Sequence, residues 1–351
     1  MEAPAALPAE LAAHVDLRVL TEWLEAAGVG RGPVTRADPL AGGTQNIMLR
    51  ITQGGRDMIL RRTSPHPRPY SSTALRREAR VLRALSETAV PHPKLIASEA
   101  DDGVLGGAFL LMEPVGGFNP GEGLPAMHRR SPAMRRAMGE SYIDALAALA
   151  EVDVGRVGLL DFGKPDGFLQ RQVPQWLAAL EGYARVDSWP GPDRLRGVTR
   201  VADWLQRNRP ADAPPGLIHG DCHLANTMYP HDSGEIAALI DWEMSTVGDP
   251  RLDLGWVMAT WPNGEDDTVG LNIVPWDGFP TLDDMIARYA GHTTRPLDAA
   301  PWFGAMACFK LGILLEGTYA RACAGQAPAP VGARLHAAAV ALFRRGLRFI
   351  A

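Results

Sequence analysis

The chain has 351 residues, a formal net charge of −5, 46% hydrophobic residues and 21% charged residues. This composition is typical of a globular protein, and the slight acidic excess argues against a nucleic-acid-binding protein, which usually carries a basic patch. The length favours two unequal lobes over a single core, and the expected partner is a small molecule.

The first part of the chain predicts a small lobe built around an antiparallel sheet. Its predicted elements are a helix over 16–27, strands over 39–51 and 56–62, a helix over 72–86 and a strand over 104–112. Asp16 can cap the first helix, and a small-residue loop at 41–46 interrupts the first strand. Residues 113–117 then form a predicted hinge. We therefore expect a nucleotide-binding lobe with a lead-in helix over 1–113.

The rest of the chain, 114–351, predicts a larger and mostly helical lobe. Its predicted helices cover 132–150, 170–183, 249–256, 281–290, 302–323 and 331–349, and its short strands cover 217–219, 227–229 and 236–240. The last two strands form a predicted hairpin around 231–234, and Thr281 with Asp284 resembles a capping box. The order of elements is that of an α+β protein with a separate helical region.

Two short motifs carry chemistry. Residues 219–226 read His-Gly-Asp-Cys-His-Leu-Ala-Asn, and Asp241-Trp242-Glu243 follows at the end of an apolar strand. Phosphoryl transfer needs a carboxylate that accepts the proton of a hydroxyl, and oxygen ligands that hold Mg²⁺ on the nucleotide phosphates. Asp221, Asn226 and Asp241 supply such a set.

These motifs are similar to those of the aminoglycoside phosphotransferase family, relatives of the protein kinases, and the resemblance extends over most of the chain. It implies a two-lobed protein-kinase-like fold, with a small antiparallel-sheet lobe and a larger helical lobe. It also implies ATP, or GTP, and Mg²⁺ as cofactors, with Asp221 as the catalytic base and Asn226 and Asp241 as magnesium ligands. Asp249 and Asp253, in Gly-Asp-Pro-Arg-Leu-Asp, would brace the site.

The small lobe offers the nucleotide contacts. The predicted nucleotide-binding residues are Gly42, Gly43, Thr44, Asn46, Arg61, Glu78, Glu113 and Val115. Backbone N–H groups of the small-residue loop would cover the phosphates, and the hinge would bind adenine. Protein kinases pair a strand lysine with a helix glutamate, whereas this chain offers Arg61 with Glu78. Only three of its 35 basic residues are lysines, and an arginine can bind phosphate bidentately.

Each of these residues also has a structural interpretation. Asp221 and Asp241 can cap loops, Asn226 can serve a turn, and Glu78 can be a solvated helix charge. His219 is interpreted as a scaffold residue. Two other classes of protein stay open: a zinc hydrolase, from the alternation of His219, Asp221 and His223, and a non-catalytic nucleotide-binding module, from the missing lysine.

The acceptor is the least determined feature. Aminoglycosides and choline are cationic, and the visible acidic candidates for such an acceptor are 265–267, Asp283 and Asp284. Lys310 and Glu316 are further candidate contacts. The Leu-Arg-Arg strand and the Gly-x-Tyr-Ala-Arg helix at 317–321 are similar to the family branch found with acyl-CoA dehydrogenases, which implies a hydroxyacyl-CoA acceptor.

The location is expected to be cytoplasmic. Residues 1–10 lack a basic region followed by an apolar stretch, which argues against a secretory signal. The most apolar stretch, 302–319, contains Lys310 and Glu316, so we expect a buried helix and no membrane segment. Three cysteines in no metal-ligand spacing suit a reducing compartment without disulfides. The sequence does not predict the oligomeric state.

Overall fold

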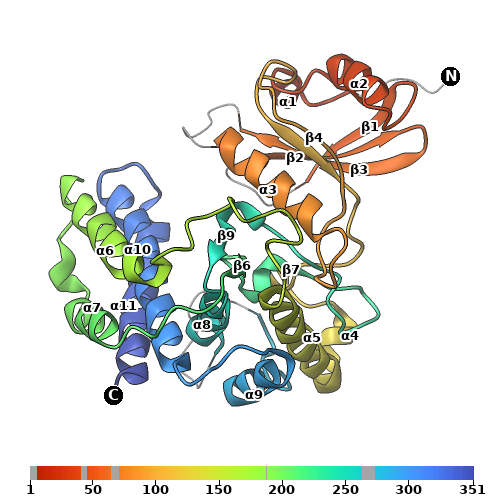
Figure 1. Cartoon of the computed structure of the whole chain (residues 1–351). Helices are drawn as coiled ribbons and strands as arrows, with labels where there is room; N and C mark the ends of the chain where they lie inside the picture. The colour runs from red at the N-terminus through yellow and green to blue at the C-terminus, as the bar shows by residue number, and fades with distance from the viewer. Residues whose placement is uncertain (1–5, 41–45, 65–70, 187, 263–272) are drawn as a thin grey trace. The chain divides into compact units, whose positions relative to one another are not determined.

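The computed structural model describes residues 6–40, 46–64, 71–186, 188–262 and 273–351. Within them the chain forms two compact units (Figure 1). The first contains residues 1–116 and 237–244, and the second contains 117–236 and 245–351. The lobe boundary predicted after residue 113 stays a prediction; the structure adds that a short segment from late in the chain belongs to the first unit.

The first unit is a five-stranded antiparallel sheet with the strand order β1-β2-β3-β5-β4. Its elements are α1 (Ala9–Ala12), α2 (Leu17–Ala26), β1 (Val34–Pro39), β2 (Asn46–Gln53), β3 (Arg56–Thr63), α3 (Ser71–Leu85), β4 (Leu95–Glu99), β5 (Phe109–Met112), β8 (Ala238–Leu239) and η5 (Trp242–Met244). The antiparallel sheet was predicted. Strands β1 and β4 were not predicted as such.

Period-two alternation in the strands decides which helix covers which face of this sheet. Leu49, Ile51 and Leu60 are buried in one cluster with Leu20 and Leu24 of α2. The residue after Leu60 points to the opposite face, where α3 contacts β3, β4 and β5. The sheet therefore has a helix on each face, and alternate residues of β3 serve different purposes.

The second unit is mostly helical. Its helices and strands are α4 (Ala126–Arg130), α5 (Pro132–Ala150), α6 (Phe168–Gly182), α7 (Val198–Arg207), β6 (Gly216–Ile218), β7 (Thr227–Met228), β9 (Thr246–Gly248), α8 (Arg251–Thr260), α9 (Leu282–His292), α10 (Ala300–Cys323) and α11 (Ala329–Phe349). Short 3₁₀ turns occur at η1 (Pro120–Glu122), η2 (Tyr183–Arg185), η3 (Pro192–Arg194) and η4 (Leu224–Asn226). Strand β6 pairs with β9 in an antiparallel ribbon.

Most of the predicted helices are confirmed, several of them almost to the residue. Helix α5 has the predicted bounds, and the capping box of α9 is present, with hydrogen bonds in both directions between Thr281 and Asp284. Asp16 accepts hydrogen bonds from the first turn of α2, as expected. The strand predicted over 104–112 is wrong at its start, because residues 102–107 form turns and Gly106 has a positive φ of 72°.

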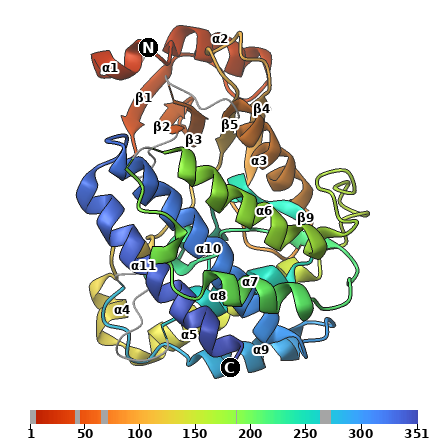
Figure 2. The ribbon, with the colours of Figure 1, turned by 90° about the vertical axis from the view of Figure 1, so that its left-hand side faces the viewer.

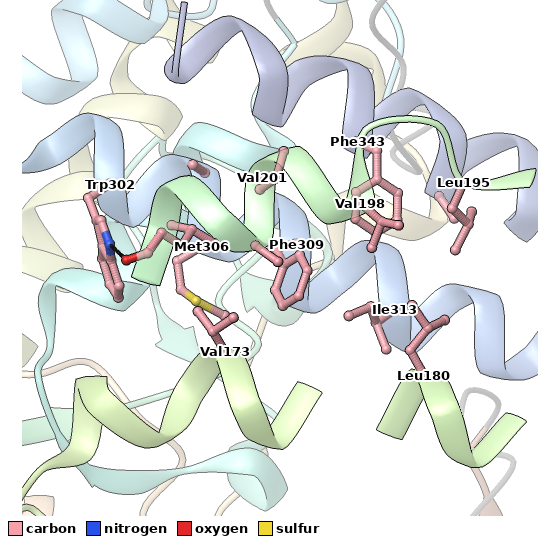
Figure 3. Close-up of a cluster of buried hydrophobic side chains, with 14 of the residues drawn as sticks. Val173, Leu180, Leu195, Val198, Val201, Trp302, Met306, Phe309, Ile313 and Phe343 are labelled. Atoms are coloured by element: carbon pink, nitrogen blue, oxygen red, sulfur yellow. Dashed lines mark hydrogen bonds between the residues drawn. The ribbon is translucent and has the colours of Figure 1, made fainter. Parts of the chain in front are cut away.

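The core of the helical unit lies between α6, α7, α10 and α11 (Figure 2). Val173 of α6, Val201 of α7, Phe309 of α10 and Phe343 of α11 meet in this cluster (Figure 3). Trp302 closes one end, with its indole N–H donating to the carbonyl of Leu205 at 2.9 Å. Helix α10 is therefore a buried helix, as its apolar sequence predicts, and it is the rigid support for the side chains that it carries.

Candidate active site

The first unit holds a buried ion pair between β3 and α3. Arg61 Nη1 donates to Glu78 Oε1 at 2.8 Å, and the side chains are 10% and 2% exposed. Because Leu60 faces α2, Arg61 faces α3, and Glu78 lies within the apolar stripe of α3 that covers this face. The structure thus joins the two residues that the sequence proposed as the cation–glutamate pair of the nucleotide lobe.

Arg61 also bonds two acids that follow β8. Its Nη2 donates to Asp241 Oδ1 at 2.8 Å and lies 3.7 Å from Glu243 Oε2. Burial raises the pKa of Glu78 to about 7, while the Arg61 charge opposes this rise and the nearby Asp241 and Glu243 add to it. One guanidinium therefore contacts three carboxylates, and its planar fork suits this arrangement better than a single ammonium does.

The neighbouring Arg62 has a different role. Its Nε donates to the carbonyl of Leu105 at 2.8 Å, and its Nη1 donates to the carbonyl of Thr63 at 2.9 Å. Both contacts fix the backbone near the ends of β3 and β5. Arg62 is thus a packing residue, and the geometry favours Arg61 as the predicted nucleotide-lobe cation.

Asp241 has an unusual backbone conformation. Its φ of +67° lies in the left-handed region, which non-glycine residues rarely adopt, although aspartate is among those that do. Backbone of this kind costs free energy and is concentrated at functional sites. The carboxylate is 36% exposed, so one face of it can bind a ligand while Arg61 holds the other.

The second unit contains the His219–Asn226 loop, whose start is fixed by Asp253 of α8. The two carboxylate oxygens of Asp253 accept the backbone N–H groups of His219 at 2.7 Å and Gly220 at 2.9 Å. Burial raises the pKa of Asp253 to about 6, and these two amides oppose the rise. The loop therefore begins in one fixed conformation, in which Gly220 has a φ of +85° that a glycine adopts without strain.

Asp221 and Asn226 contact each other within this loop. Asn226 Nδ2 donates to the carbonyl of Asp221 at 2.8 Å and to its Oδ2 at 3.1 Å. These bonds occupy the amide nitrogen and leave the amide oxygen as the group that can bind a cation. His223 Nε2 lies 3.6 Å from Asp221 Oδ1. The predicted base and one predicted magnesium ligand are thus neighbours in space.

Two residues that the sequence did not assign to the loop also hold it. The hydroxyl of Tyr142, on α5, donates to the carbonyl of Cys222. Lys310 Nζ, on α10, donates to the carbonyl of Gly220 at 3.2 Å. Lys310 could have been suspected as one of three lysines in the chain, but Tyr142 gave no signal because an aromatic residue in a helix is usually a core residue.

Four further residues of the small lobe were predicted to bind the nucleotide phosphates. Gly42, Gly43 and Thr44 lie outside the described residues. Asn46 begins β2 and pairs with Thr63 of β3. These placements leave the predicted phosphate loop as a prediction.

The backbone groups of the predicted hinge differ in whether they already have a hydrogen-bond partner. The Glu113 N–H donates to the carbonyl of Lys94 at 2.9 Å, so it is not available to a ligand. Among the described residues, the N–H of Val115 has no partner, and Pro114 has no N–H to offer. A ligand at the hinge would therefore meet the Glu113 carbonyl and the Val115 N–H.

The geometry argues against the zinc-hydrolase interpretation. The ring of His219 is fully buried, and its Nδ1 accepts the backbone N–H of Asp221 at 3.3 Å. In the described part of the chain, no three or more His, Cys, Asp or Glu side chains converge as a metal-binding group. His219 thus contributes to the loop as the scaffold residue that was expected.

Three further acids named from the sequence have structural partners. Asp249 pairs with Arg251 at 2.7 Å and accepts its backbone N–H at 3.1 Å, so it supports the start of α8 and does not hold the loop as Asp253 does. Asp284 caps α9. Glu316 is fully buried and accepts the indole N–H of Trp189 at 2.8 Å. The acidic candidates at 265–267 lie outside the described residues.

Comparison with known proteins identifies the family. Residues 36–292 match the model of the phosphotransferase enzyme family, so the chain belongs to this family. Its class is that of small-molecule phosphotransferases with a hydroxyl acceptor, and its fold is the two-lobed kinase-like fold predicted from the sequence.

Two relatives and two solved structures illustrate the match. A probable acyl-CoA dehydrogenase of Arabidopsis thaliana is 30% identical over 79% of the chain and 34% of its own length. Acyl-CoA dehydrogenase family member 10 of Mus musculus is 27% identical over 81% of the chain and 26% of its own length. The chain therefore spans about a third of the length of such relatives.

The solved structures cover nearly the whole chain. A putative aminoglycoside phosphotransferase of Ralstonia eutropha is 27% identical, with a TM-score of 0.76 over 94% of this chain and 98% of that one. A complex of an aminoglycoside phosphotransferase with GDP and kanamycin is 16% identical, with a TM-score of 0.62 over 95% of this chain and 99% of that one. The second similarity concerns the fold alone.

The buried ion pair of the first unit can be tested by removing its cation. Arg61→Met leaves Glu78 buried beside two other carboxylates, so we expect the free energy of unfolding to fall by about 3–5 kcal/mol. The control Arg56→Met removes an arginine that is 48% exposed and 3.4 Å from Glu113, which contributes about 0–1 kcal/mol. Urea unfolding measures both; equal losses in the two variants would contradict the role of Arg61.

The brace on the loop can be tested with Asp253→Asn. The amide places an N–H₂ group against one of the two backbone N–H donors, so we expect a loss of about 1–3 kcal/mol in the free energy of unfolding. The control Asp283→Asn changes an exposed residue of α9 and should alter stability little. Urea unfolding of both proteins is the measurement, and an unchanged Asp253→Asn protein would show that the brace contributes nothing.

Proposed function

We propose that the chain transfers the γ-phosphate of ATP, with Mg²⁺, to a hydroxyl group of a small molecule. The carrying observation is the fixed His219–Asn226 loop, in which Asp221 is 27% exposed beside Asn226. A carboxylate held in this way can orient the acceptor hydroxyl and take its proton as the oxygen attacks the phosphorus. Asp221 is thus proposed as the catalytic base.

Each of the two proposed magnesium ligands has an oxygen atom suited to the ion. Mg²⁺ binds oxygen ligands and usually only one or two carboxylates of the protein. Asn226 offers its amide oxygen, because its nitrogen is already bonded to Asp221, and Asp241 offers the face of its carboxylate that Arg61 does not hold. When bound, the ion would neutralise charge on the transferred phosphate. Arg61 and Glu78 would orient the nucleotide phosphates, and the hinge backbone would bind the base.

ATP is the proposed nucleotide, with GTP as the alternative. Solved neighbours hold AMP-PNP and hygromycin B in one case, and GDP and kanamycin in another. A hinge that offers the Glu113 carbonyl and the Val115 N–H presents one acceptor and one donor, which matches the amino group and ring nitrogen of adenine.

For the acceptor we propose a hydroxyacyl-CoA. The support is the identity to proteins named acyl-CoA dehydrogenases, together with the C-terminal features that resemble this branch of the family. Of the described acidic candidates, Asp284 caps α9, Glu316 is buried against Trp189 and Asp283 is exposed on α9. An aminoglycoside or a choline-like amine is the alternative acceptor.

A cytoplasmic location is part of this proposal. ATP and acyl-CoA thioesters are metabolites of that compartment, and Cys222, Cys308 and Cys323 are free thiols. Among the described residues, no helix is both long enough and apolar enough to cross a bilayer.

An acceptor screen tests the function. The purified protein is incubated with MgATP and, separately, with hydroxyacyl-CoAs, aminoglycosides, choline and homoserine, and ADP release is measured. We expect turnover with hydroxyacyl-CoAs and a loss of at least about 100-fold in Asp221→Asn, in line with the contribution of a general base. Asp232→Asn, at an exposed position eleven residues further along the chain, is the matched control and should retain activity.

Two outcomes would change the proposal. Turnover with an aminoglycoside alone would retain the phosphotransferase and replace the acceptor. ADP release that is equal in the wild type and in Asp221→Asn would remove Asp221 from the mechanism.

A further inference from the structure

A partly buried lysine lies beside the proposed catalytic loop and has no part in the proposed chemistry. Lys310 lies in the middle of α10, and its Nζ donates to the carbonyl of Gly220, the residue before Asp221, at 3.2 Å. The chain contains only three lysines among 35 basic residues. A lysine at this position therefore departs from the general preference of the chain for arginine.

The surroundings of Lys310 disfavour its charged form. Nζ lies 4.7 Å from the ring centre of Trp256 and 5.7 Å from that of Trp176. Burial lowers the pKa of Lys310, while the charges of Asp253 and Asp221 oppose this effect. A buried ammonium costs free energy unless it is partnered, so its contacts must offset that cost. The partners are the two aromatic faces, the Gly220 carbonyl and the two acids.

Lys310 and Asp253 both bind the short piece of backbone before Asp221. Asp253 accepts the N–H groups of His219 and Gly220, and Lys310 donates to the carbonyl of Gly220. The hydroxyl of Tyr142 donates to the carbonyl of Cys222, two residues after Gly220. The peptide unit that precedes Asp221 and the Cys222–His223 peptide unit that comes after it are thus held by side chains from helices.

We propose that Lys310 is a positioning residue for phosphoryl transfer, which fixes the Gly220–Asp221 peptide so that the Asp221 carboxylate meets the acceptor hydroxyl. This inference rests on the proposed function of Asp221. Lysine suits the role because its compact ammonium fits between two aromatic rings and one carbonyl, whereas a guanidinium brings five N–H donors that need partners in the same space.

The proposal predicts opposite effects on stability and turnover. In Lys310→Met the partly buried charge is replaced by an apolar side chain of similar length, a type of change that is often neutral or stabilising. Turnover should nevertheless fall by about 10- to 100-fold, because a catalytic group that is slightly misplaced loses rate. The KM for ATP should stay within about twofold of the wild type, since nucleotide contacts are unchanged.

The experiment compares Lys310→Met, Lys310→Gln and the control Lys164→Met, which changes an exposed lysine of the same unit. For each protein we measure kcat, the KM for ATP, the thermal midpoint, and hydrogen exchange of the amides of residues 220–226. We expect both Lys310 variants to show lower kcat and faster exchange in the loop at an unchanged or higher midpoint. Lys164→Met should match the wild type.

Three results would overturn the proposal: unchanged kcat, unchanged loop exchange in both variants, or a kcat that falls only together with the thermal midpoint. The last result would make Lys310 an ordinary structural residue. Hydrogen exchange needs no acceptor, so it tests the positioning role even when the wild-type protein turns over none of the compounds, and that failure would count against the proposed function alone.

Discussion

The two hydrogen bonds from the His219 and Gly220 amides to Asp253 are the constraint on which the candidate site depends. An irregular loop carries backbone N–H and C=O groups that must find partners once they are buried. In this chain Asp253, Tyr142 and Lys310 supply those partners, and all three come from helices of the second unit. The loop can therefore present a partly exposed carboxylate, Asp221, on a backbone that is fixed by hydrogen bonds. Preorganisation of this kind is what a general base requires.

In the first unit, buried charged groups likewise need partners. Arg61 and Glu78 are almost fully buried, and each would be costly without the other. Their pairing fixes β3 to α3 and directs the second nitrogen of Arg61 towards Asp241. Asp241 keeps its strained backbone because this contact stabilises it. An arginine in place of the lysine of protein kinases can thus still pair with the helix glutamate. It also makes a second, simultaneous contact with Asp241 that a lysine would make less easily.

The sequence predicted what local patterns determine and missed what depends on tertiary contacts. Helix α5, the capping box of α9 and the buried helix α10 follow from apolar periodicity and from cap residues, and each appears as expected. Strand β4 was missed because the alternation in Leu95–Glu99 is weak, with all five residues half-buried. Asp253 was identified through the family resemblance. The contacts of Lys310 and Tyr142 could not be predicted, because they bring helices distant in sequence to two carbonyl groups that carry no sequence signal.

The central claim is that this chain binds a magnesium nucleotide and transfers its phosphate. The most direct test is calorimetric titration of MgATP, and of ATP with EDTA, into the wild type, Asp221→Asn and Asp241→Asn. The account predicts magnesium-dependent binding that Asp221→Asn retains and Asp241→Asn loses in large part, since Asp241, unlike Asp221, is a proposed ligand of the ion. Binding by none of the three proteins, or binding by all three that is indifferent to magnesium, would contradict it.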